Sequence, residues 1–162
     1  MNRQTSIAAG LLLLALVIQA QAQTPASPCP GAQTPGLRVE SATSPGAATA
    51  LPTGTPVAAS LQAVDRIFFA VPAGDRPIAR TYGGTFALDL AQTGAWRVAV
   101  DAQAHIDLVQ GGKRIAPRDT GAVTGGCFVQ QARYDLKPGH YLLQLSASQI
   151  PVLSLLVERT QK

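Results

Sequence analysis

The sequence predicts an all-β protein, a sandwich of about eight strands. Apolar and polar residues alternate along most of the stretch from Phe86 to Val157, and this alternation places every second side chain in a core. Turn signals that contain Gly or Pro recur roughly every 8–12 residues. No long segment has the period of roughly 3.6 residues that is typical of an amphipathic helix.

Three strands are expected before residue 72, the first of them within the segment that precedes the domain. Residues 37–40 predict a short edge strand. In residues 56–63 the alternation of apolar side chains favours a strand, although Pro56 would also suit the first position of a short helix. Residues 66–71 (RIFFAV) predict a buried strand that ends at Pro72.

The second half of the chain alternates more clearly. Strands are expected at residues 86–90, 94–100, 104–109, 127–136, 141–146 and 152–157. A short edge strand is expected at residues 115–116, and residues 118–126, with three glycines, predict a loop. The expected inward-facing residues are Phe86, Leu88, Leu90, Trp96, Val98, Val100, Ile106, Leu108, Phe128, Ala132, Tyr134, Leu136, Tyr141, Leu143 and Leu145.

The N-terminus has the features of a bacterial export signal. Arg3 precedes an apolar run at residues 7–18, and the small residues of Ala20-Gln21-Ala22 predict cleavage after Ala22. The apolar run is shorter than the ~20 residues that a membrane-spanning helix needs. We therefore expect residues 1–22 to be a signal peptide, the protein to be periplasmic, and no transmembrane span to remain after cleavage.

A Pro-, Ala- and Thr-rich segment follows the signal. Residues 23–55 carry few large apolar side chains and are expected to form an extended, largely disordered arm. Residues 56–162 are then the β-sandwich domain.

The two cysteines, Cys29 and Cys127, predict a disulfide, because an even number of cysteines in an exported chain is most simply paired. Two free thiols are the alternative. A bond that closes a loop of about 100 residues would stabilise the fold by up to ~4.7 kcal/mol and would fix the arm to the domain.

Charge argues against a nucleic-acid partner. The formal net charge is +4, and the sequence has no run of five or more basic residues. Lys113, Arg114, Arg118 and Arg133 are candidates for one cationic end of the sandwich that binds an anionic glycan or a lipid headgroup. Ordinary solvated turns are the alternative.

Few residues suit catalysis or metal binding. His105 and Asp107 share one face of an expected strand, and His140 would complete a metal site if its strand were adjacent. Solvent-facing polar residues are the alternative. Trp96 is a candidate stacking platform for a sugar ring, or a core residue. No serine lies in a Gly-x-Ser-x-Gly motif.

Several segments resemble the bacterial pre-peptidase C-terminal domain, a jelly-roll-like antiparallel sandwich of secreted proteins. They are DRIFFAVPAG (65–74), GAWRVAV (94–100), HIDLVQGG (105–112), LKPGHYLLQL (136–145) and VLSLLV (152–157). The resemblance covers about 95 residues.

The sequence is also similar to a group of short exported proteobacterial proteins, through residues 82–86 (YGGTF), 94–99, 106–109, Cys127 and 136–141. Chains of that group are sometimes labelled homogentisate 1,2-dioxygenase. A non-haem iron site needs about two His and one carboxylate on one metal, and His105 and His140 are the only histidines.

We therefore expect a non-catalytic periplasmic binding or accessory module without a cofactor, whose partner is a periplasmic protein or a glycan. Copper or zinc handling, and dioxygenase activity, are the alternatives.

Overall fold

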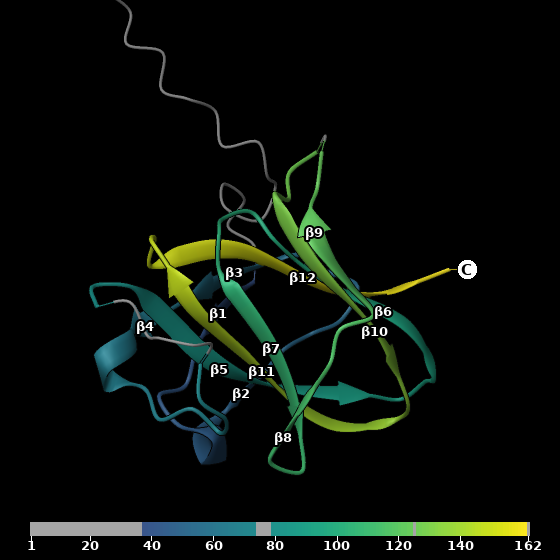
Figure 1. Cartoon of the computed structure of the whole chain (residues 1–162), viewed down its shortest axis with the longest axis horizontal. Coiled ribbons are helices and arrows are strands. Elements are labelled where there is room, and N and C mark those ends of the chain that lie inside the picture. Colours follow the sequence, from purple (N-terminus) through teal and green to yellow (C-terminus); the bar gives the residue numbers. More distant parts are fainter. Residues whose placement is uncertain (1–36, 74–78, 125, 162) are drawn as a thin grey trace, which may run out of the picture.

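The computed structural model describes residues 37–73, 79–124 and 126–161. Within these residues, twelve strands form two six-stranded sheets that pack face to face, which confirms the all-β sandwich (Figure 1). The helices among the described residues are two short 3-10 turns, Pro45–Ala47 (η1) and Val64–Arg66 (η2), and neither is long enough to cross a membrane.

The first sheet has the late strand β12 near its middle. In spatial order its strands are β1 (Arg38–Glu40), β3 (Val57–Ser60), β12 (Val152–Thr160), β6 (Gly94–Val100), β10 (Gln130–Leu136) and β9 (Asp119–Ala122). All neighbours are antiparallel except β1 and β3. This sheet is called sheet A below.

The second sheet, sheet B, is arranged around β5 and β11. Its spatial order is β2 (Thr49–Ala50), β5 (Tyr82–Leu90), β11 (Gly139–Ser148), β7 (His105–Gln110) and β8 (Lys113–Ile115), with β4 (Gln62–Ala63) also paired to β5. Only β2 and β5 are parallel within the described part of this sheet.

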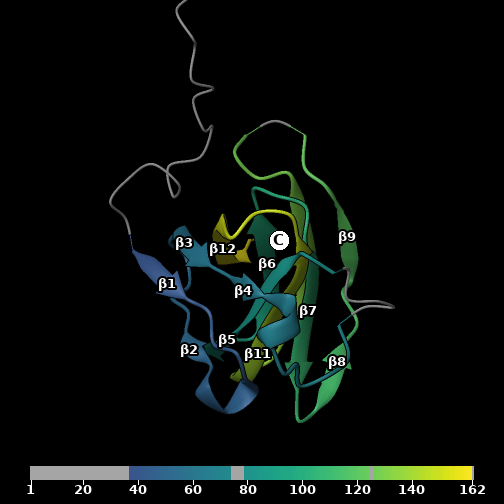
Figure 2. The same ribbon diagram turned by 90° about the vertical axis from the view of Figure 1, so that its left-hand side faces the viewer.

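The expected antiparallel sandwich of about eight strands therefore needs two corrections. Strands β2 and β9 were not expected, and β1 and β2 pair in parallel with β3 and β5 respectively, so both sheets are mixed. Figure 2 shows β1 and β2 on one side of the sandwich and β8 and β9 on the other.

Residues 37–55 do not form part of an extended arm. They supply β1 to sheet A and β2 to sheet B, and Val39 and Leu51 are buried in the core. The packed domain therefore begins before residue 56. Residues 23–36, and with them Cys29, lie outside the described residues.

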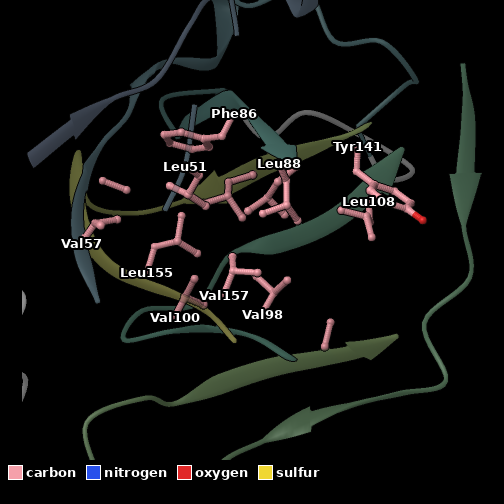
Figure 3. Close-up of a cluster of buried hydrophobic side chains, with 14 of the residues drawn as sticks. Leu51, Val57, Phe86, Leu88, Val98, Val100, Leu108, Tyr141, Leu155 and Val157 are labelled. Carbon is pink, nitrogen blue, oxygen red and sulfur yellow. The ribbon is translucent and has the colours of Figure 1, made fainter. Parts of the chain in front are cut away.

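The core lies between the sheets and is built from the inward-facing positions of their strands (Figure 3). The alternation along β5, β6 and β11 correctly predicted which side chains are buried there. These side chains are Phe86, Leu88, Leu90, Trp96, Val98, Val100, Tyr141, Leu143 and Leu145. Burial of such side chains contributes about 1.5–3 kcal/mol each, so this layer is the main source of stability.

The prediction of a buried strand at residues 66–71 is wrong. The 3-10 turn η2 occupies its start, and residues 67–73 continue without regular structure. The backbone N–H groups of Ala70 and Val71 bond to a side chain, the amide oxygen of Gln144, and no neighbouring strand is needed to satisfy them.

Residues 118–136 differ from expectation in two details. Residues 119–122 form the edge strand β9 where a loop was expected, and all four of its residues are exposed. A strand with both faces in water carries no apolar alternation to reveal it. The following strand begins at Gln130, so Phe128 lies outside it and is only partly buried.

Candidate functional site

The two histidines are not brought together. Strands β7 and β11 are neighbours, but His105 lies opposite Ser146 and His140 lies opposite Asp89, at the other end of β11. Six residues of strand, roughly 20 Å, separate these two positions. The ring Nδ1 of His140 is instead hydrogen-bonded to the carboxylate of Asp89. In the described parts of the chain, no three His, Cys, Asp or Glu residues lie close enough to hold a metal ion, so the candidate triad of His105, Asp107 and His140 is not formed.

The buried carboxylate of Asp107, on the outer face of sheet B, forms an ion pair with the exposed side chain of Arg114. The Asp107 side chain is 5% exposed, and Arg114 Nε lies 2.6 Å from one carboxylate oxygen. His105 Nε2 lies 3.4 Å from the other oxygen. Arg114 also donates a hydrogen bond to the carbonyl oxygen of Pro72 at 2.5 Å. The carboxylate is therefore engaged in holding Arg114, and through it the backbone at residue 72.

Tyr134 lies in the core near this ion pair. Burial raises the pKa of its phenol well above the usual range, and the negative charge of Asp107 raises it further. Its hydroxyl donates a long hydrogen bond of 3.5 Å to the carbonyl oxygen of Ile106. The phenol is therefore neutral over the physiological pH range.

The basic residues do not form one cationic end. Arg118 and Arg133 line a common hollow on sheet A, but each is paired with a carboxylate, Asp135 at 3.8 Å and Asp119 at 3.2 Å respectively. Arg114 belongs to sheet B, as does Lys113, which lies exposed in the same strand. The three arginines are each paired with a carboxylate, so the candidate anion-binding cluster is not assembled.

Trp96 is a core residue. Only 6% of it is exposed, and its indole Nε1 donates a hydrogen bond to the carbonyl oxygen of Gln92 at 3.3 Å. A sugar ring therefore has no access to its face, and the alternative of core packing is correct.

The irregular segment at residues 64–73 covers part of the outer face of sheet B, and we refer to it as the platform. Gln144 of β11 is only 1% exposed and connects the sheet to the platform. Its Oε1 accepts hydrogen bonds from the N–H groups of Ala70 at 2.7 Å and Val71 at 3.2 Å. Its Nε2 donates to the carbonyl oxygen of Val71 at 3.1 Å. A second anchor is the bond from Arg114 to Pro72.

The platform displays an unusual apolar surface. Phe68 is 77% exposed, the highest value among the exposed large apolar side chains of the described residues. A hollow of about 510 Å³ lies on the same segment. Its apolar wall includes Ala63, Val64, Ile67 and Phe69, and its charged lining residues are Asp65 and Arg80. This size and lining fall in the range of small-molecule sites.

Sequence reasoning missed both parts of this site. Gln144 alternates with the core residues Leu143 and Leu145, and this pattern places its side chain on the outer face of the strand without showing that other residues cover it. One signal did exist: Ile67, Phe68 and Phe69 are three consecutive large apolar residues, and a strand buried on one face cannot cover all three.

Comparison with known proteins finds no family model that matches the sequence and no curated protein with significant similarity.

Proposed function

We propose that the protein is a non-catalytic binding module and that the platform is its binding surface. The observation that carries this proposal is the exposed ring of Phe68 beside an apolar hollow, on a segment whose backbone is held at a fixed position. Burying an aromatic side chain of this size under a ligand would contribute about 1.5–3 kcal/mol to binding, and this free energy is not gained while the ring is exposed to water. Exposed apolar surface next to a pocket is typical of an interaction site.

The anchoring of the platform supports the same conclusion. Three hydrogen bonds between Gln144 and the backbone, and one donated by Arg114, hold residues 70–72 against sheet B. A surface that is already ordered loses little conformational entropy when a ligand arrives. Preorganisation of this kind is expected of a recognition surface.

A fragment screen by NMR tests the proposal. Uncharged and charged apolar fragments are added to the isotope-labelled protein, and amide shifts are mapped. We expect the shifts to concentrate at residues 63–69, and we expect Phe68→Ala to weaken the binding of those fragments. Val129→Ala is the matched control, because Val129 is also exposed, at 37%, on a different loop. Hits that concentrate elsewhere, or an equal effect of both substitutions, would contradict the proposal.

We also propose that this module works in the periplasm, as a jelly-roll-like sandwich of the pre-peptidase C-terminal kind. The export signal at residues 1–22 supports the location, and the segments 94–100, 105–112 and 136–145 support the kinship. N-terminal sequencing of protein recovered from a periplasmic extract tests the location. The expected first residue is Gln23.

A further inference from the structure

We infer that the platform hollow binds a small zwitterion with an apolar side chain, of which a free apolar amino acid is the simplest case. This inference rests on the proposed binding function and adds the chemical class of the ligand.

Two opposite charges border the hollow from different segments. Asp65 lies in η2, and Arg80 lies in the turn that precedes β5. Among the described residues neither forms an ion pair, whether with the other or with a third group. By contrast, Arg114, Arg118 and Arg133 are all paired with carboxylates. The rim therefore offers one acceptor for a cation and one donor set for an anion.

The backbone at Arg80 supports a role for its side chain. Arg80 has a φ of 68°, in the left-handed region that residues with a Cβ rarely adopt and that glycine adopts freely. The chain nevertheless has arginine there, beside a hollow that a guanidinium can reach. A planar guanidinium binds a carboxylate through two parallel hydrogen bonds.

The wall of the hollow determines the rest of the ligand. Ala63, Val64, Ile67 and Phe69 form an apolar surface, and a volume of about 510 Å³ is ample for an amino acid with a branched or aromatic side chain. The α-ammonium group would pair with Asp65 and the α-carboxylate with Arg80. Apolar molecules that carry only one of these charges would leave one rim charge without a partner.

A titration with matched ligands tests this assignment. L-leucine, 4-methylpentanoate, which lacks the ammonium group, and 3-methylbutylamine, which lacks the carboxylate, are each added to the labelled protein purified after expression of the full chain. Amide shifts are followed at Val64, Ile67 and Thr81. We expect L-leucine to bind at least about tenfold more tightly than either analogue.

Substitutions at the rim provide the second arm. Asp65→Asn and Arg80→Gly should each weaken L-leucine binding about tenfold or more, to the affinity of the analogue that lacks the corresponding charge. Arg80→Gly suits the left-handed backbone, so the fold is expected to persist, and the amide spectrum checks this. Arg66→Gln is the matched control: Arg66 is exposed and adjacent to Asp65 but does not line the hollow, so its loss should leave the affinity unchanged.

The outcomes separate this inference from the proposed function. If 4-methylpentanoate or 3-methylbutylamine binds in the hollow as tightly as L-leucine, the zwitterion assignment is overturned while the binding function stands. If peptides with an apolar N-terminal residue bind much more tightly than L-leucine, the assignment to a free amino acid is overturned. If neither these compounds nor any apolar fragment shifts the amides of residues 63–69, the inference and the proposed function both fail.

Discussion

Replacing Gln144 with methionine tests how the platform is held. Methionine has nearly the same length and shape but can make none of the three hydrogen bonds to Ala70 and Val71. Each buried backbone group left without a partner costs about 1–3 kcal/mol. Because the segment can shift and let water reach some of these groups, we expect a total loss of about 2–4 kcal/mol in the free energy of unfolding.

Two measurements on Gln144→Met check this prediction. Urea denaturation gives the free energy of unfolding, and hydrogen exchange of the Ala70 and Val71 amides reports the platform directly. Gln103→Met is the control, because Gln103 is exposed in a turn and should change stability by less than about 0.5 kcal/mol. If Gln144→Met is as stable as this control and its two amides exchange as slowly as in the wild type, the platform is not anchored through Gln144.

Two further predictions concern the fold. Gly84→Ala should destabilise the fold by about 1–3 kcal/mol, because the new Cβ would lie 2.1 Å from Ser41 Cβ. Gly121→Ala is the control and should be nearly neutral, because its new Cβ meets no atom within 4 Å. Equal urea midpoints for the two variants would refute the predicted clash. The pKa of Tyr134 is raised in the folded state, so its contribution to stability is complete below the unfolded pKa of about 10 and decreases as the pH rises above that value. Tyr134→Phe should therefore make the free energy of unfolding, measured by urea denaturation, fall less steeply between pH ~8 and ~11. The same pH dependence in both proteins would contradict the assignment.

The core could be predicted from the sequence because alternation determines which face of a strand each side chain occupies. Phe86, Leu88 and Leu90 were assigned to the core from this pattern alone, and each is at most 4% exposed. The same pattern carries no information about the outer face. Gln144 is buried because residues 70–71, more than seventy positions earlier in the chain, lie over it.

The candidate site was less predictable for a related reason. The shared face of His105 and Asp107 could be predicted from their spacing, and the structure places them 3.4 Å apart. Their distance from His140 depends on the register between β7 and β11, which the sequence does not reveal. The run of Ile67, Phe68 and Phe69 predicted burial from composition, yet Phe68 is displayed outward because the platform has no second layer above it.

The central position of the late strands governs the order in which the chain can fold during synthesis. In sheet A, β12 lies between β3 and β6 and pairs with both, and in sheet B, β11 lies between β5 and β7 and pairs with both. Until β11 and β12 have been made, each sheet therefore consists of separated halves, and long-range pairing of this kind is slow to form. A nascent chain that still lacks β11 and β12 should therefore stay unfolded.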